Sequence, residues 1–219
     1  MRGSPVASDR APFDETFRAR LRELLAWRRD VRSFRGDRLP TDAIEELVEL
    51  ACLAPSVGNA QPWRFVLVDD FARRAAVRAD FERNNARALA GYDGERAQLY
   101  SRLKLSGLDR APVQLAVFAD HGTERGHGLG RATMPETIAY SVVAAVHTLW
   151  LAARARGIGV GWVSILDPVR VRAVLDLPVT WSLVAYLCVG FPETEDLTPE
   201  LERVGWQARI DAGSFLVRR

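Results

Sequence analysis

The sequence contains few residues of the kinds that crosslink or metallate small proteins. Its 219 residues include two cysteines, Cys52 and Cys188, which lie far apart and have no CxxC or histidine-spaced partner. This pattern excludes a zinc motif and a disulfide framework. His121 and His127 are six residues apart without a neighbouring pair of carboxylates, so they are better interpreted as loop histidines than as metal ligands. We therefore expect no metal.

Long apolar segments are also scarce. The most apolar stretch, residues 138–153, is shorter than the ~20 residues needed to span a bilayer and contains His147, which indicates a buried helix. The first residues have no apolar region typical of a signal peptide and instead form an arm rich in Pro, Ser and Arg. We expect a cytoplasmic protein with no membrane partner, a mobile arm over residues 1–13 and a single domain over residues 14–219.

Lysine is nearly absent. Of the 30 basic residues only Lys104 is a lysine, and 28 acidic residues reduce the formal net charge to +2. Balanced charge argues against a nucleic-acid partner, which requires a field of one sign. The abundance of arginine reflects either a coding bias or the planar, bidentate recognition of anions by guanidinium groups.

The hydrophobic pattern predicts an α+β fold. Strands are few and do not alternate strictly with helices, which indicates a small mixed or antiparallel sheet wrapped by helices. The residues from Pro192 onward carry few apolar side chains and are expected to form an extension. Helices are predicted from Asp14, from Pro40, over 71–90, over 94–106, from Pro135 to Arg156 and from Asp167 to Leu175, and strands over 65–68, 114–119, 159–165 and 181–189.

A cluster of arginines around one aspartate follows the first predicted helix. It reads Arg28, Arg29, Asp30, Val31, Arg32. On a helix, Arg28 and Arg32 are four residues apart and share a face, so both could point at one phosphate. A solvated helix end rich in Arg and Asp explains the same pattern equally well.

Two further stretches combine small and polar residues. Between Ser56 and Pro62, exposed backbone N–H groups lie beside hydroxyl and amide side chains, an arrangement suited to a flat polar heterocycle or to a plain helix-to-strand connector. Gly159 and Gly161 allow the close approach of a backbone or a ligand, and Ser164 offers a hydroxyl at the strand end. A strand packed tightly on a helix explains the glycines as well.

Four segments together resemble one known family. They are RRDVRSF at 28–34, APSVGNAQPWRFV at 54–66, YSRLKLSGL at 100–108 and GWVSILDP at 161–168. This combination resembles the BluB-type flavin destructases, a branch of the nitroreductase superfamily, in order from about residue 14 to about residue 210. Ordinary nitroreductases commonly have a serine at the position of Asp30. A carboxylate beside a flavin phosphate is electrostatically unfavourable, so its presence indicates a chemical role.

The resemblance implies an enzyme that consumes its flavin. Reduced FMN would bind as a substrate and be fragmented with O2 to 5,6-dimethylbenzimidazole, the lower ligand base of vitamin B12, and erythrose 4-phosphate. The implied architecture is a nitroreductase-like fold in a homodimer that exchanges C-terminal extensions, with the site between two subunits. We expect the loop from about Asp93 to Met134 to cover the flavin and a separate flavin reductase to supply reduced FMN.

The resemblance also implies roles for particular residues. Asp30 would act as the general base or proton shuttle at the ribityl C1′ atom, and Ser164 would hydrogen-bond near the flavin N5 or the ribityl chain. The implied flavin-binding residues are Arg28, Arg29, Asp30, Val31, Arg32, Ser56, Gly58, Ala60, Gln61, Pro62, Lys104, Gly161, Trp162, Val163, Ser164 and Arg209.

Two other functions are compatible with most of these motifs. An NAD(P)H-dependent FMN nitroreductase or quinone reductase would cycle its FMN intact, and Asp30 is the feature that argues against it. A non-catalytic FMN-binding protein would carry the same pocket motifs, and only chemistry separates it from the destructase.

Overall fold

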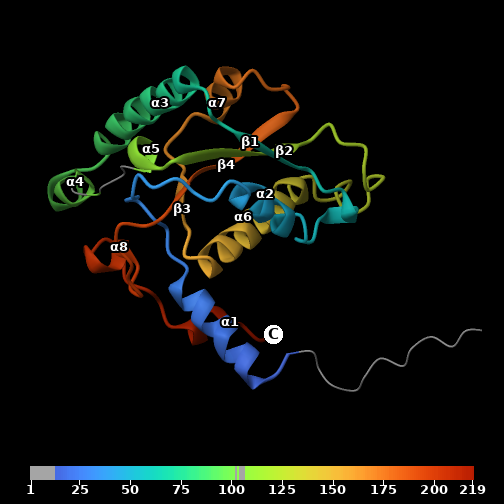
Figure 1. Ribbon diagram of the computed structural model, residues 1–219, viewed down its shortest axis with the longest axis horizontal. Helices are drawn as coiled ribbons and strands as arrows, with labels where there is room; N and C mark the ends of the chain where they lie inside the picture. Colours follow the sequence, from blue (N-terminus) through green and yellow to red (C-terminus); the bar gives the residue numbers. More distant parts are fainter. Residues whose placement is uncertain (1–12, 102, 104–106) are drawn as a thin grey trace, which may run out of the picture.

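The computed structural model describes residues 13–101, 103 and 107–219. Lys104 and all of the predicted mobile arm except Phe13 lie outside these described residues. The elements, shown in Figure 1, are α1 (Glu15–Trp27), α2 (Ala43–Ala51), η1 (Val57–Asn59), β1 (Trp63–Leu67), α3 (Phe71–Leu89), α4 (Gly94–Ser101), α5 (Gly107–Arg110), β2 (Val113–Asp120), α6 (Thr137–Ala155), β3 (Gly159–Val163), α7 (Pro168–Val174), β4 (Trp181–Gly190), α8 (Glu200–Arg203) and η2 (Ala212–Phe215).

The predicted α+β class is confirmed. The four strands form one sheet in the order β1-β2-β4-β3, and every neighbouring pair is antiparallel. Each predicted strand is present with its ends shifted by a few residues. The short helices α5 and α8 were not predicted, because four residues are too few to show a helical period.

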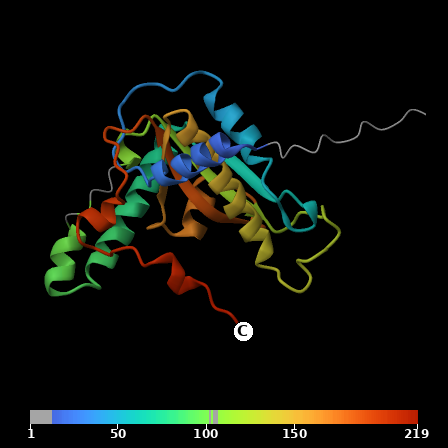
Figure 2. The same cartoon turned by 90° about the horizontal axis from the view of Figure 1, so that it is seen from below.

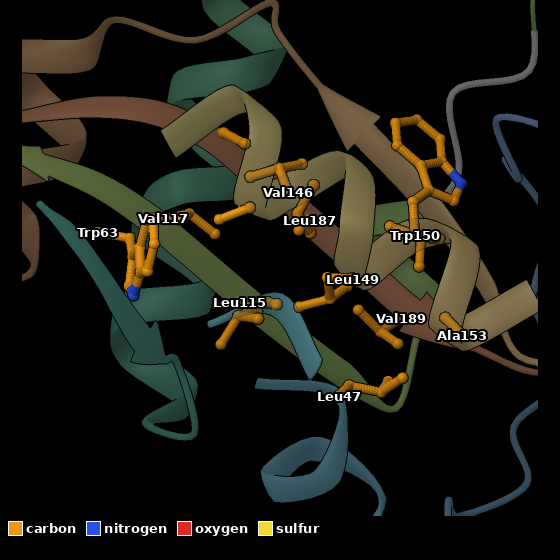
Figure 3. Close-up of a cluster of buried hydrophobic side chains, with 14 of the residues drawn as sticks. Leu47, Trp63, Leu115, Val117, Val146, Leu149, Trp150, Ala153, Leu187 and Val189 are labelled. Atoms are coloured by element: carbon orange, nitrogen blue, oxygen red, sulfur yellow. The ribbon is translucent and has the colours of Figure 1, made fainter. Parts of the chain in front are cut away.

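Both faces of the sheet are buried because its residues alternate between two cores. One core joins Leu115 and Leu187 to α2 and α6, and Figure 3 shows Leu149 and Trp150 of α6 lying against the sheet. The opposite core joins Phe118 and neighbouring residues to α3, α5 and α7. In Figure 1, α3 and α7 accordingly lie on one side of the sheet and α6 on the other.

Helix α6 is the apolar helix expected from the sequence. Its length and mean hydropathy of 1.3 are sufficient for a membrane span, but core helices pass the same test and 44% of this window is buried inside the protein. The buried side chains recur at three- and four-residue spacing along one stripe that faces the sheet. The prediction of a buried helix is confirmed.

The two ends of the described chain pack least well. Helix α1 contains no buried residue, and residues 207–219 are exposed throughout. Figure 2 shows the segment after α8 running away from the sheet. Large apolar side chains remain exposed at both ends, including Phe17 and Leu25 in α1 and Ile210 and Phe215 in the tail.

Candidate active site

The arginine cluster is extended and not helical. Helix α1 ends at Trp27, and Arg28 has φ −68° and ψ 117°. The chain leaves the helix because Val31 N donates to Val160 O at 3.0 Å, and Asp30 forms a parallel bridge with Val160. The expectation that Arg28 and Arg32 share a helical face is therefore wrong. In an extended chain, residues two apart face the same way, so Asp30 lies beside Arg32.

Two glycines of β3 allow this segment to lie directly on the strand. A Cβ atom on Gly159 would lie 2.8 Å from a methyl carbon of Val31, and one on Gly161 would overlap the Val31 carbonyl oxygen. The predicted close approach is confirmed: the Val31 side chain approaches Gly159, and the Val31 backbone approaches Gly161. The fit of Val31 against these glycines fixes where the neighbouring Asp30 and Arg32 point.

Asp30 is held by one backbone donor and one guanidinium. Its Oδ1 accepts from Trp162 N at 2.9 Å, and its Oδ2 accepts from Arg32 Nε at 3.4 Å. The Asp30 side chain is 38% exposed and that of Arg32 is 15% exposed. Both partners orient the carboxylate while leaving part of it accessible.

A first cavity, of about 590 Å³, lies beside the cluster. We call it the arginine cavity after its six arginines: Arg28, Arg29, Arg32, Arg154, Arg203 and Arg209. Two of their guanidiniums are fixed by aromatic rings, with Arg28 5.2 Å from the centre of the Trp150 ring and Arg154 5.4 Å from that of Trp27. Acidic side chains also line the arginine cavity and pair with some of its arginines. Arg154, for example, lies 2.5 Å from the Glu195 carboxylate.

Arg29 has the most unusual environment in the arginine cavity. Its Nη2 donates to Ala26 O, but its Nε is buried without a hydrogen-bond partner among the residues that the structure describes. Burial, followed by the positive charges of Arg209 and Arg28, lowers the pKa of Arg29 from its ordinary value. An anion near these three guanidiniums would satisfy the buried N–H and reverse the lowering of the pKa.

A second cavity, of about 250 Å³, also borders the segment from Asp30 to Arg32. We call it the aromatic cavity after Phe81, Tyr100, Trp162 and Trp206, which line it together with Ser164. Tyr100 is fixed by donating to Asn85 Oδ1 at 2.7 Å, and its ring centre lies 6.1 Å from that of Trp206.

The wall of the aromatic cavity also contains the Cys188 thiol. Burial raises the pKa of Cys188 to about 12. The thiol is therefore neutral at physiological pH and contributes to the wall as an apolar group.

The two cavities meet at the arginine cluster. Asp30, Val31 and Arg32 line both of them, as does Leu201. Of the other predicted site residues, Arg28, Arg29 and Arg209 line the arginine cavity, and Gly161, Trp162, Val163 and Ser164 line the aromatic cavity.

The predicted loop from Ser56 to Pro62 lies elsewhere. Val57 N donates to Ser141 Oγ near the start of α6, whereas Arg154 lines the arginine cavity near the end of that helix. Thirteen residues of helix separate these positions by about 20 Å. The described chain therefore does not bring Ser56, Gly58, Ala60, Gln61 or Pro62 to either cavity.

The expectation that a loop from about Asp93 to Met134 covers the flavin is also wrong. The middle of this segment is β2, a strand with neighbours on both sides that belongs to the core. The first part reaches the aromatic cavity through Tyr100, Leu103 and Gly107. Residues 121–134 lie instead against the loop from Ser56 to Pro62, where a Cβ atom on Gly58 would meet the Gly126 carbonyl oxygen at 2.9 Å.

Several cavity residues were missed by the sequence reasoning. Arg154 and Arg203 are two arginines among many, and no sequence pattern separates them from solvated ones. Trp206 offered a usable signal, because a tryptophan in a polar tail requires a partner. Its partners are Tyr92, with a ring centre 5.5 Å away, and Tyr100.

The described residues contain no group of three or more His, Cys, Asp or Glu side chains arranged to hold a metal ion. The chemical groups in the arginine cavity are instead guanidiniums, carboxylates and hydroxyls, and those in the aromatic cavity are aromatic rings, the Ser164 hydroxyl, the Cys188 thiol and the Asp30 and Arg32 side chains.

Residues 25–191 match the nitroreductase family, and the chain belongs to that family. A "5,6-dimethylbenzimidazole synthase" of Rhodospirillum rubrum is 61% identical over 90% of this chain and 93% of that protein. A protein of the same name from Rhodobacter capsulatus is 52% identical over 90% of this chain and 96% of its own length. Among solved structures, oxidised iodotyrosine deiodinase bound to FMN and 3-iodo-L-tyrosine superposes with a TM-score of 0.71, at 26% identity over 90% of this chain and 97% of that chain.

Proposed function

We propose that this protein is a 5,6-dimethylbenzimidazole synthase, which uses O2 to fragment reduced FMN into 5,6-dimethylbenzimidazole, erythrose 4-phosphate and a further fragment that carries the remaining atoms of the pyrimidine ring. The observation that carries the proposal is the Asp30 carboxylate, held by Trp162 N and Arg32 where the arginine cavity meets the aromatic cavity. The 61% identity to a protein named for this activity supports it.

The residues present fit FMN. FMN carries one phosphate, which could accept a hydrogen bond from the buried Nε of Arg29, a donor that has no partner within the described part of the chain. Arg28, Arg32 and Arg209 add three further guanidiniums to the same cavity. The aromatic cavity offers rings and a strand edge for a flat heterocycle. In this arrangement the phosphate lies in the arginine cavity, the ring system lies toward the aromatic cavity and the ribityl chain passes Asp30.

The residues of the two cavities have separate roles in the proposed reaction. When bound, reduced FMN supplies both the electrons for O2 and the atoms of the benzimidazole. The arginines fix the register of the ribityl chain, and such positioning lowers reaction barriers by several kcal/mol. Asp30 removes or shuttles the proton at the ribityl C1′ atom, a task worth about 10²–10⁴-fold in typical acid–base catalysis. Ser164 donates or accepts a hydrogen bond near N5 or the ribityl chain.

A homodimer would complete the site. The loop from Ser56 to Pro62 lies about 20 Å from the arginine cavity along α6, so a second copy of the chain is needed to bring it to the flavin. The exposed apolar side chains Ile210, Phe215 and Leu216 of the tail support its exchange between subunits. Lys104 belongs to the same proposed site.

The proposal includes a separate flavin reductase and a cytoplasmic location. The rings of Tyr100 and Trp206, which line the aromatic cavity and pack with Tyr92, support a site whose space beside the flavin is taken by aromatic side chains rather than by a nicotinamide ring. Reduction of bound FMN by NADPH at the rate of an ordinary nitroreductase would contradict this part of the proposal. The free state of both Cys52 and Cys188 fits a reducing compartment.

One experiment separates this function from the alternatives. The protein is mixed with chemically reduced FMN, air is admitted and the products are separated by chromatography. We expect dimethylbenzimidazole and a matching loss of flavin. Quantitative recovery of intact FMN would instead indicate a reductase or a flavin-binding protein.

A further inference from the structure

Asp80 is a buried carboxylate that lies in neither cavity. It is on α3 and is only 2% exposed. Burying a charge is costly unless partners compensate it. Two partners come from its own helix, with Arg83 Nη2 2.7 Å from Oδ1 and Asn84 Nδ2 3.2 Å from Oδ2. The other two come from the far side of the connector after β3, with Arg170 Nε 3.6 Å from Oδ1 and Asp167 N 2.8 Å from Oδ2.

The bond from Asp167 N ties the connector between β3 and α7 to α3. This connector is residues 164–167, and it begins with Ser164. At its first end, Val163 pairs with Tyr186 in the sheet. At its other end, the Asp167 carboxylate caps α7 by accepting from Val169 N at 2.9 Å and Arg170 N at 3.1 Å. The side chain of Asp167 therefore fixes α7, while its backbone N–H is directed to Asp80.

Helix α3, which carries Asp80, also lines the aromatic cavity. Phe81, the residue after Asp80, contributes to its wall, and so do Ser164 and Ile165 of the connector. The bond between Asp167 N and Asp80 Oδ2 thus joins two walls of one cavity. A shift of the connector relative to α3 would move the Ser164 hydroxyl and change the shape of the cavity.

We propose that Asp80 is a positioning residue that places the Ser164 hydroxyl by holding the backbone amide of Asp167. This inference rests on the proposed function for the role of Ser164, but the anchoring itself does not. Functional groups must be held within about 0.5 Å of their working positions by surrounding contacts, and a buried carboxylate is a stiff acceptor for this purpose.

The anchoring is tested by hydrogen exchange on the protein without flavin. In Asp80→Ala, we expect the peptide that covers residues 164–167 to exchange about tenfold faster, because a lost hydrogen bond is worth about 1.4 kcal/mol. Peptides of α6 should be unchanged. Arg83→Gln is the matched control, since it removes an ion pair to the same carboxylate but keeps the bond to Asp167. Unchanged exchange over 164–167 in Asp80→Ala would overturn the inference.

The positioning is tested by a double-mutant cycle on the partition of reduced FMN between dimethylbenzimidazole and reoxidised FMN. Asp80→Ala and Ser164→Ala should each lower the benzimidazole fraction, which is measured at saturating reduced FMN so that a change in flavin affinity does not contribute. The double variant should be no worse than Ser164→Ala alone, because Asp80 acts through Ser164. If the losses of benzimidazole caused by the two single substitutions multiply in the double variant, the inference is overturned.

A second variant keeps the test decisive if Asp80→Ala does not fold. Asp80→Leu is close in size to aspartate but has no acceptor for Asp167 N, so it should change both readouts in the same direction as Asp80→Ala. Normal exchange and normal partition in Asp80→Leu would overturn the inference. Absence of benzimidazole from the unmodified protein overturns the proposed function instead, and hydrogen exchange alone then decides whether Asp80 holds the connector.

Discussion

The arginine cavity and the aromatic cavity share a wall but differ in chemistry. Six guanidiniums and several carboxylates surround the first. Of the described residues that line the second, only Asp30 and Arg32 are charged. Charge is suited to holding an anion, and a less polar, partly enclosed wall is suited to reaction because electrostatic effects are stronger there. The difference indicates that affinity and reactivity reside in different residues and can be changed separately.

The largest effect is expected at the junction. Asp30→Asn can still accept a hydrogen bond from Trp162 N but cannot remove a proton. Benzimidazole formation should fall by about 10²–10⁴-fold, while reduced FMN remains bound. The measurements are single-turnover product yield and flavin affinity under anaerobic conditions.

A control distinguishes proton transfer from a simple change in charge. Asp196→Asn removes the same charge from the arginine cavity, where Asp196 pairs with Arg203 at 3.3 Å. It should leave the product yield unchanged. An undiminished yield from Asp30→Asn would remove Asp30 from its assigned role.

The next effect concerns binding in the arginine cavity. Arg209→Ala removes one charged hydrogen-bond donor, worth about 1.5–3 kcal/mol, so affinity for reduced FMN should fall roughly 10–100-fold. The fraction of bound flavin converted to benzimidazole should not change. Titration calorimetry without oxygen measures the affinity, and Arg87→Ala on the exposed side of α3 serves as the control. A changed product fraction at saturating flavin would show that the two cavities are not separable.

A moderate effect is expected where the two cavities are joined. Gly161→Ala forces a methyl group against the Val31 carbonyl oxygen and should displace the cluster from β3. Such overpacking typically costs about 1–3 kcal/mol and lowers Tm by roughly 2–4 °C per kcal/mol for a chain of this size. Gly36→Ala, which meets no atom within 4 Å, should leave the thermal midpoint unchanged. Equal midpoints for the two variants would contradict the close packing of Val31 on Gly161.

The smallest effect concerns the acidic rim of the arginine cavity. The hydrogen bond from Arg154 holds the pKa of Glu195 below its ordinary value. The folded state therefore gains stability above the unfolded pKa of about 4.3 and loses it as the pH falls through the lower folded pKa. Because Glu195 is half exposed, solvent screening limits the gain to a few tenths of a kcal/mol.

Glu195→Gln measures this contribution. Urea unfolding should show a small deficit relative to the unmodified protein at pH 7, and the deficit should disappear near pH 3. A deficit that grows as the pH is lowered would reverse the assigned direction.

The sequence predicted the scaffold better than the site. Local hydrophobic pattern determines the helices and strands, whereas pairing between distant residues determines the site. Helix α6 shows its buried stripe in its own residues. The cluster from Arg28 to Arg32 does not reveal that it is extended, because the strand edge that pairs with Val31 lies about 130 residues later in the chain. Trp206 lines a cavity only because the tail returns to α4.

Isotope labelling tests most directly whether Asp30 acts on a flavin that is consumed. Reduced FMN carrying ¹³C at the ribityl C1′ atom should be mixed with the protein in air and the products examined by mass spectrometry and NMR. We expect dimethylbenzimidazole labelled at C2 from the unmodified protein and intact labelled FMN from Asp30→Asn. Recovery of intact FMN from both proteins, or benzimidazole without the label, would contradict this expectation.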